Sequence, residues 1–430
     1  MVEERGMSRA AALVRDIGFV SFGKYGQYVV TAVTLPLIAR VLGPEGLGLL
    51  AIGMSAYFIG SLLVDLGITQ FLAAKVPNSD VNQIRGDYLA IRLTVLGTLG
   101  AALVVGLTIG VDPHVHMILL GLFAGGFWSV SEDWVLIGQG RFVASTVYQG
   151  AGRLAYLALL LVVLPRFPSA SVALLCMLAS STLTVALTWR DSLRKYGRPA
   201  RPRRVVPTVR MAAPVFTSRL LVVSYGQGAA AIYSAVLDAA SLGLYSAGDR
   251  LVRAVQSMLD PIGFALLPRM ARSSGDARFW RRATLAMLAC VGIAVLVTAA
   301  LWIAAPLAVR LVFGSDFADA VPLLRVEVLI LPATALSSFV TTAVLPVRED
   351  TSGVLIGAII GTCIAAVALY AAFRTHSVWA LVYGTVACEF GVALWYVLRT
   401  RHLVLRERRT APSEADVDAA DVPVSRGEKR

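Results

Sequence analysis

Residues 245–260, YSAGDRLVRAVQSMLD, combine an apolar helical face with a regular row of polar side chains. At about 100° per residue, an arc of about 120° on this predicted helix holds seven polar positions. These are Ser246, Asp249, Arg250, Arg253, Gln256, Ser257 and Asp260. A guanidinium group can donate two hydrogen bonds to one phosphate or carboxylate, and a carboxyl group can bind a proton. We therefore predict Arg250, Arg253 and Gln256 as substrate-binding residues, and Asp249 and Asp260 as ion-coupling residues.

A structural interpretation of this stripe stays open beside the functional one. Asp249 and Arg253 are four residues apart, which is the spacing of a self-neutralising ion pair on a helix. Asp260 precedes Pro261, so the two residues are also typical of a kink with an acidic group near the membrane surface.

A milder polar row lies in residues 16–42. Lys24, Tyr25 and Tyr28 share one helical face with two hydroxyl side chains. Lys24 gives this face a point charge, although a lysine near the start of a helix can also extend to the membrane surface. We predict Lys24, Tyr25 and Tyr28 as substrate-binding residues.

Other charges interrupt predicted apolar helices. Arg219 has polar neighbours on several sides of its helix, and we predict it as a substrate-binding cation. Asp65 ends a long apolar run and Glu389 lies near the middle of the last one, so both are predicted as ion-coupling residues. Glu389 and Arg153 could equally each be half of a structural pair.

The elements that must hold these residues are membrane helices. The chain of 430 residues is 57% hydrophobic and 15% charged, with a mean hydropathy of +0.72, whereas soluble domains are about 25% charged. Long apolar runs then predict an all-α integral membrane protein. We expect twelve transmembrane helices at 16–42, 46–72, 88–111, 115–138, 142–164, 170–189, 208–236, 241–268, 283–312, 320–346, 352–373 and 377–398.

The distribution of basic residues predicts the orientation. Up to residue 410, Lys and Arg number 25 in the termini and in the loops on their side, against four in the loops on the other side. The positive-inside rule therefore predicts a multi-pass protein of the bacterial cytoplasmic membrane with both termini in the cytoplasm. The net charge of +12 follows this topology, so we expect no nucleic-acid partner.

No motif predicts an enzyme. The four cysteines are scattered through apolar helices, His114 and His116 have no visible third ligand, and there is no phosphate-binding loop of the Walker type. We expect no cofactor, no metal and no catalytic residue. The short outer loops also disfavour a membrane-embedded glycosyltransferase, polymerase or ligase.

An internal repeat is visible at an offset of 195 residues. Lys24 falls on Arg219, and Asp65 falls on Asp260. The segment 47–49 falls on 242–244, and Gly53 on Gly248. Because each repeat holds an even number of helices, both halves have the same orientation, related by a pseudo-two-fold axis along the membrane normal with a central cavity between them. We predict two six-helix lobes at 1–190 and 208–400, a basic cytoplasmic linker at 191–207, and a disordered cytoplasmic tail at 401–430.

Two blocks carry a family resemblance. The segment 39–70, ARVLGPEGLGLLAIGMSAYFIGSLLVDLGITQ, resembles the first two helices of bacterial polysaccharide flippases of the Wzx type, which belong to the multidrug/oligosaccharidyl-lipid/polysaccharide exporter superfamily. The segment 310–332, RLVFGSDFADAVPLLRVEVLILP, is similar to that family's block between helices 9 and 10. The resemblance covers nearly the whole chain.

The resemblance implies a flippase for isoprenoid-diphosphate-linked oligosaccharides, acting in O-antigen or exopolysaccharide synthesis. It implies a central cavity with cations, for which Lys24, Arg219, Arg250 and Arg253 lie on comparable helices. Membrane lipids, a polysaccharide polymerase and glycosyltransferases are the implied partners. Asp249 and Asp260 depart from this pattern, since they reduce the charge of the stripe to zero. An ion-coupled multidrug exporter and a lipid II flippase of the same superfamily are the alternatives.

Overall fold

The computed structural model describes the backbone of residues 2–76, 80–272, 279–348 and 350–410. Within these ranges, it does not describe the side chains of 2–32, 70, 74, 259–272, 346, 351 and 408–410. The described elements are helical: α1 (Val2–Asp65), α2 (Thr69–Lys75), α3 (Val81–Ile109), α4 (Pro113–Trp128), α5 (Asp133–Gly138), α6 (Phe142–Val163), α7 (Ala170–Tyr196), α8 (Val205–Tyr225), α9 (Ala229–Tyr233), α10 (Ala239–Arg272), α11 (Phe279–Val312), η2 (Ser315–Phe317), α12 (Ala320–Glu327), α13 (Ile330–Phe339), η3 (Val340–Val344), η4 (Pro346–Arg348), α14 (Thr351–Thr375) and α15 (Val378–Thr410).

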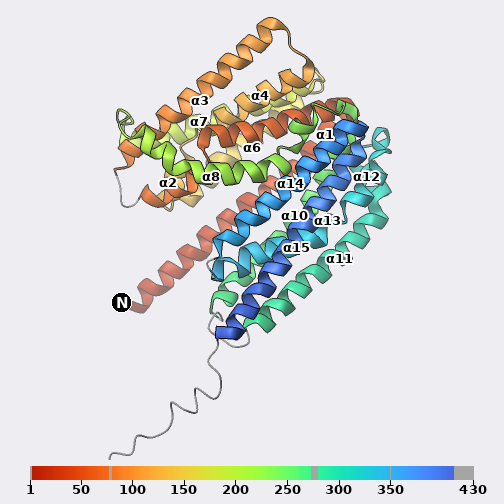
Figure 1. Ribbon diagram of the computed structural model, residues 1–430. Helices are drawn as coiled ribbons and strands as arrows, with labels where there is room; N and C mark the ends of the chain where they lie inside the picture. Colours follow the sequence, from red (N-terminus) through yellow and green to blue (C-terminus); the bar gives the residue numbers. More distant parts are fainter. Residues whose placement is uncertain (1, 77–79, 273–278, 349, 411–430) are drawn as a thin grey trace, which may run out of the picture.

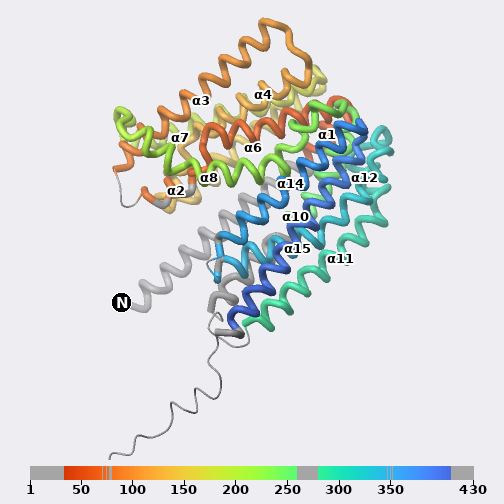
Figure 2. Tube along the Cα trace, in the orientation of Figure 1, coloured from red at the N-terminus to blue at the C-terminus, as the bar shows by residue number. Residues whose placement is uncertain are grey.

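The helices form two groups that are inclined to each other and meet at one end (Figure 1). The N-terminal group runs from α1 to α7, and the C-terminal group from α10 to α15, as the colour sequence in Figure 2 shows. Helix α8 belongs to the contact between them, because it packs on α14 as well as on α1 and α3. This arrangement confirms the predicted fold class of helices in two lobes.

Ten helices in the described part of the chain are long and apolar enough to cross a membrane. Their outward faces carry large exposed side chains such as Leu154, Leu296 and Ile303, which is expected where the solvent is lipid. Helix α10 is not among the ten. Its stripe of charges, rather than its length of 34 residues, sets it apart.

Glycines close the end where the two groups meet. Helix α1 turns at Gly43, whose φ of +67° is open to glycine at little cost. Just after this turn, a Cβ on Gly48 would strike the carbonyl oxygen of Ala239 on α10. Reciprocally, a Cβ on Gly243 would strike the carbonyl oxygen of Pro44. Both contacts keep the 195-residue offset, as a pseudo-two-fold axis between the groups requires.

Apolar packing continues across this contact, which we call the Gly43 end. Leu47 of α1 and Leu242 of α10 are fully buried in one hydrophobic cluster. Arg40 of α1 donates a hydrogen bond of 2.6 Å to the carbonyl oxygen of Leu311, at the end of α11. The two helix groups are therefore in tight contact at the Gly43 end.

Several predicted helices contain breaks. The segment 115–138 divides into α4 and α5, 208–236 into α8 and α9, and 320–346 into α12, α13 and the π-helix η3. Interrupted spans of this kind occur where a membrane protein builds a binding site, because the freed backbone groups must be satisfied inside the protein.

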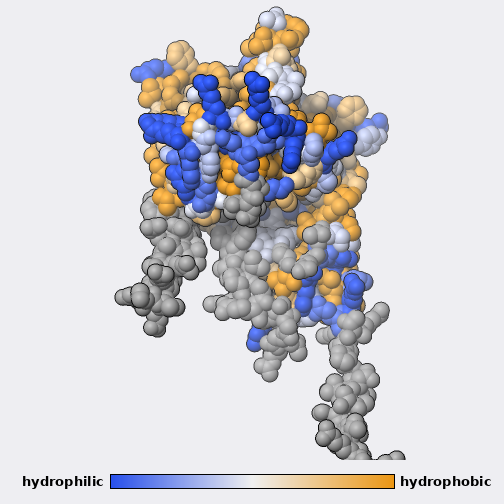
Figure 3. All heavy atoms as spheres, turned by 90° about the vertical axis from the view of Figure 1, so that its left-hand side faces the viewer, coloured by the Kyte–Doolittle hydropathy of each residue, from blue (hydrophilic) through white to orange (hydrophobic). Residues whose placement is uncertain are grey.

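The basic connection is ordered against α3. The backbone nitrogens of Arg203 and Arg204 donate to the Asp87 carboxylate at 2.6 and 2.9 Å, and Ala200 donates to the carbonyl oxygen of Asn82. Helix α7 continues to Tyr196, within the range predicted as the linker. Figure 3 shows hydrophilic surface over this end of the N-terminal group, with hydrophobic surface at its sides.

Candidate functional site

The last residues of α1 form a tight turn that fixes Asp65. Leu66 and Gly67 both have positive φ, and the backbone nitrogen of Gly67 donates to the Asp65 carboxylate at 2.6 Å. The hydroxyl group of Tyr88 on α3 donates to the Asp65 carbonyl oxygen at 2.8 Å. Asp65 is thus held by its own turn and by a neighbouring helix.

Two arginines interact electrostatically with Asp65, one from its own helix group and one from α8, the helix at the contact between the groups. The first is Arg92 of α3, which lies 3.7 Å from the Tyr88 ring centre and donates to the carbonyl oxygen of Ser131 at 3.0 Å. The second is Arg219 of α8, which approaches from the other side. Asp65 therefore has a fixed cation within its own group and a second one across the interface.

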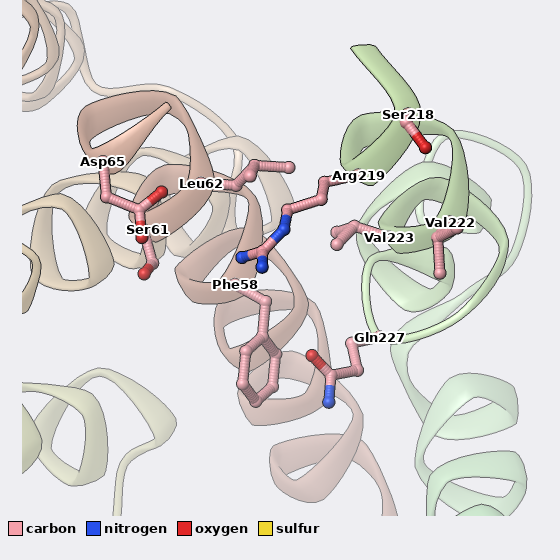
Figure 4. Close-up of a pocket in the computed structure, with 9 residues that line it drawn as sticks. All are labelled: Phe58, Ser61, Leu62, Asp65, Ser218, Arg219, Val222, Val223 and Gln227. Carbon is pink, nitrogen blue, oxygen red and sulfur yellow. The ribbon is translucent and has the colours of Figure 1, made fainter. Parts of the chain in front are cut away.

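Arg219 and Asp65 line a pocket of about 300 Å³ between α1 and α8. Figure 4 shows the Arg219 side chain extending from α8 toward α1. The pocket is lined by Phe58, Ser61, Leu62, Asp65, Ser218, Arg219, Val222, Val223 and Gln227. Both helices contribute apolar residues to the lining, and the polar groups are one guanidinium, one carboxylate, one amide and two hydroxyls.

Gly67 makes room for the guanidinium. A Cβ on Gly67 would lie 2.7 Å from Cδ of Arg219, and its φ of +67° also disfavours other residues. The Asp65-Leu66-Gly67 sequence that carries the family resemblance therefore has a local reason: the acid fixes the turn, and the glycine admits the cation from α8.

Described residues of the predicted stripe on α10 interact with each other and with a neighbouring helix. Nε of Arg253 lies 2.8 Å from Oδ1 of Asp249, and the two side chains are 33% and 21% accessible. Arg250 interacts electrostatically with Asp249 and with Tyr156 of α6, in the N-terminal group. Arg250 thus faces across the interface between the two groups.

Two of the remaining predicted residues, Glu389 and Gln256, are partly buried in the C-terminal helix group. Glu389 of α15 is partly buried and interacts electrostatically with Arg253. Gln256 is partly buried on α10, one turn beyond Arg253. The side chains of Lys24, Tyr25, Tyr28 and Asp260 lie outside the described ones, although their backbone is helical in α1 and α10.

Sequence reasoning missed three groups in or beside the site. Gln227 lies in the break between α8 and α9, in the sequence YGQG, where the glycines signal an interrupted span. Ser61 reaches the pocket from α1 and shares a hydrogen bond of 2.7 Å with Ser129. Glu327 is fully buried on α12 near Asp249. An acid inside an apolar run is itself a signal that would have found Glu327.

The pocket residues can bind an anionic group that also accepts hydrogen bonds. Arg219 supplies a forked cation, while Gln227 and Ser218 add neutral polar groups beside it. Asp65 balances the charge of Arg219 when no anion is bound. Among the described residues, no cluster of three or more His, Cys, Asp or Glu side chains is placed to hold a metal ion.

The fold has known relatives among solved structures. A lipid II flippase, MurJ, in an inward closed conformation superposes with a TM-score of 0.73, covering 89% of this chain and 87% of that one at 12% sequence identity. An inward-facing multidrug resistance MATE family transporter of the MOP superfamily gives a TM-score of 0.54, covering 91% and 96% at 14% identity. At such identities the likeness shows the fold alone.

Sequence comparison supplies the family. No curated protein matches the sequence significantly. The sequence model of a family described as polysaccharide biosynthesis protein matches residues 13–274, which is more than half of the chain and includes Asp65, Arg219 and the stripe of α10. The chain therefore belongs to the polysaccharide biosynthesis protein family.

Proposed function

We propose that the chain is a flippase that moves isoprenoid-diphosphate-linked oligosaccharide units across the bacterial cytoplasmic membrane for surface polysaccharide synthesis. The family match, the flippase-like fold and the pocket between the helix groups support this assignment. The lipid tail can stay in the bilayer during such a movement, whereas the diphosphate and the sugars need a polar path.

The observation that carries the proposal is the position of Arg219. It is a cation inside a span, at the interface between two helix groups, in a pocket that also offers an amide and hydroxyls. A charge in the membrane interior is costly unless it has a partner or faces a polar cavity. The planar fork of arginine fits the oxygens of a phosphate group, which a lysine ammonium matches only as a point charge.

The conformation fits loading from the cytoplasmic side. The helix groups are in contact at the Gly43 end. The pocket lies at the C-terminal end of α1, beside Asp65. The positive-inside rule assigns this end of α1 to the cytoplasm. Transport would then follow by rocking of one group on the other, with Asp65, Asp249, Asp260 or Glu389 as sites where an ion could bias the movement.

Asp65 gives the pocket a means of releasing its cargo. In the empty pocket the carboxylate offsets the charge of Arg219, and a diphosphate must compete with it. Because a diphosphate carries more negative charge than one carboxylate, it can displace Asp65 from Arg219. Because Asp65 competes for the same guanidinium, the binding of the diphosphate stays reversible. Arg92 keeps Asp65 partnered while Arg219 is engaged with cargo.

The test is an arginine series at position 219. In a strain lacking the chromosomal gene, Arg219→Ala should abolish surface polysaccharide and leave lipid-linked units in the inner leaflet. Loss of a charge-assisted hydrogen bond of about 1.5–3 kcal/mol corresponds to roughly ten- to one-hundred-fold weaker binding of the diphosphate lipid. Arg219→Lys should be intermediate, because it keeps the charge and loses the fork.

Arg166→Ala is the matched control. Arg166 is exposed and its side chain donates to the carbonyl oxygen of Val162, four residues earlier in the chain, so its loss should leave polysaccharide output unchanged. Immunoblots of membranes establish that all variants are present at equal levels. Wild-type polysaccharide output from Arg219→Ala at equal protein level would refute the assignment.

Lipid II is the second candidate cargo, because the superposition on the lipid II flippase is extensive. Rescue of a strain depleted of its own lipid II flippase would favour this alternative over the oligosaccharide. A drug exporter is less consistent with the pocket, since an organic cation would meet Arg219. Unchanged drug susceptibility in the deletion strain would exclude that class.

A further inference from the structure

A second charged cluster lies in the C-terminal helix group, apart from the pocket at Arg219. Helix α10 contributes Asp249, Arg250 and Arg253, helix α12 contributes Glu327, and helix α15 contributes Glu389. Arg253 interacts electrostatically with all three acids and forms an ion pair with Asp249. The cluster therefore joins three helices of one group through charge.

Glu327 is the unusual member, because its side chain is inaccessible and yet poorly partnered. Its exposed fraction is 0%. Neither carboxyl oxygen has a donor in hydrogen-bond geometry among the described residues. Tyr245 lies nearby, but its hydroxyl group is 3.2 Å from Oγ1 of Thr385 and shares a hydrogen bond with it. A buried ionised carboxylate without donors would be strongly unfavourable.

A neighbouring carboxyl group explains this position. The carboxyl group of Asp249 lies within hydrogen-bonding reach of Glu327. Ionised carboxylates only accept hydrogen bonds, so two of them in contact repel each other. A single proton between them turns the contact into a hydrogen bond, because a protonated carboxyl group is a donor.

The charge balance of the cluster also indicates one bound proton. Asp249, Glu327 and Glu389 carry three negative charges when ionised, and Arg250 and Arg253 carry two positive ones. One bound proton makes the cluster neutral, which is the favourable state in a low-dielectric interior. The other charged group of α12, Arg325, lies 4.7 Å from the Trp302 ring centre, and Glu327 is not among its described partners.

Uncharged titratable groups surround the cluster without changing this balance. Tyr156 of α6 faces Arg250, while Tyr225 of α8 and Tyr396 of α15 face Glu389. The Cys388 thiol also lies beside Glu389. None of these groups supplies a third cation at neutral pH.

Gly248 permits the contact between the two acids. A Cβ at this position would lie 2.7 Å from Oε2 of Glu327, so any larger residue would displace that carboxyl group. The backbone of α10 can therefore approach α12 closely enough for Asp249 and Glu327 to meet.

We propose that Asp249 and Glu327 form a proton-binding site in which one proton is shared between two carboxyl groups. The ligand is a proton rather than the cargo, so the inference holds whichever cargo occupies the pocket at Arg219. Release of the proton would leave two adjacent carboxylates on α10 and α12, which favours separation of these helices. The site is thus placed to let a proton gradient act on the packing of α10.

Infrared difference spectroscopy of the purified full-length protein tests the site. At neutral pH the wild-type protein should give a carbonyl band of a protonated carboxyl group that shifts in deuterated water. Glu327→Gln should remove this band, and so should Asp249→Asn. Glu389→Gln should retain it, because Glu389 is outside the carboxyl pair. A band that persists in both Glu327→Gln and Asp249→Asn would overturn the proposal.

Gly248→Ala tests the geometry with both acids in place, which covers the case in which Glu327→Gln fails to fold. It should shift the band by displacing the Glu327 carboxyl group. Gly292→Ala is the matched control, because a Cβ there would have no neighbour within 4 Å, and the band should stay in place. A wild-type band that disappears on addition of sodium ions at constant pH would instead indicate a metal cation and overturn the assignment.

Discussion

Charged residues within the helices of this protein fall into two kinds, according to their partners. Arg85 and Glu132 form a contact of 2.6 Å with exposed fractions of 0% and 2%, entirely within the N-terminal group. Arg85 also donates to the carbonyl oxygen of Gly197 at 3.0 Å and so ties down the basic connection. Arg219 of α8 and Arg250 of α10, in contrast, both interact with residues of the N-terminal group from outside it. The first kind holds a group together, and the second is placed to respond to its movement.

Arg85→Ala should be strongly destabilising. It leaves the buried Glu132 carboxylate without its cation, and breaking a buried pair in this way costs about 3–5 kcal/mol. We expect a clearly lower melting temperature in detergent and a lower level in membranes. Arg141→Ala is the control, since the Arg141–Asp191 pair is partly exposed and should contribute about 1 kcal/mol or less. Equal melting temperatures for the two variants would contradict the structural role of Arg85.

The sequence identified which residues are unusual better than it identified their partners. Asp65 and Arg219 were singled out separately by charge, and only the structure brings them into one pocket. Glu132 and Arg92 were not singled out by the sequence, although the structure buries both with partners from other helices. Helical periodicity gives the face on which a residue lies, but not the element that covers it.

At the scale of helices, hydropathy located the spans and missed their interruptions. Each predicted range overlaps a described helix, since apolar length is what a bilayer demands. The breaks after α4, α8 and α12 are short and contain few strong helix breakers beyond Gly226 and Gly228. Their backbone groups are satisfied by tertiary contacts, such as the hydrogen bond of Arg92 to Ser131, that no local pattern records.

Helix α14 depends on Asp350 at its start. The Asp350 carboxylate accepts from the backbone nitrogen of Gly353 at 3.1 Å, and from Nε and Nη2 of Arg399 on α15 at 2.6 and 2.9 Å. The hydrogen bonds from the Arg399 guanidinium lower the pKa of Asp350 below its ordinary value of 3.8. The capping residue thus also joins α14 to α15.

The sign of the pH dependence follows from this lowered pKa. Because the folded state favours ionised Asp350, its contribution is fully present above pH 3.8 and is lost as the pH falls through the lower folded value. Asp350→Asn, which keeps a capping oxygen, should melt at a lower temperature than wild type at pH 7, and the difference should shrink below pH 3.8. Asp350→Ala should be worse by about 1 kcal/mol at every pH. If the difference in melting temperature between wild type and Asp350→Asn did not change with pH, the charge of Asp350 would not be the cause of the stabilisation.

At the scale of the whole molecule, the proposed transport by rocking of the two helix groups requires the Gly43 end to open. This end is held by the reciprocal contacts of Gly48 with Ala239 and of Gly243 with Pro44, together with the buried Leu47 and Leu242. Backbone atoms of the two helices are in direct contact at this crossing. The helices are therefore either in contact or separated, and intermediate arrangements are few. The 195-residue repeat therefore has a physical consequence: each half supplies one glycine, and that glycine allows the backbone of the other half to approach closely.

Gly48→Ala should shift the molecule toward the conformation that is open at this end. The added Cβ would overlap the Ala239 carbonyl oxygen, which is backbone and cannot move aside without moving α10. A cysteine introduced at the buried Leu242 should then react several-fold faster with an impermeant maleimide from outside the cell. Gly97→Ala is the control, since a Cβ there would have no neighbour within 4 Å. If the labelling rate of Leu242→Cys is the same in all backgrounds at equal protein level, the crossing is not the barrier that must open for release, and the rocking of the two helix groups must pivot elsewhere.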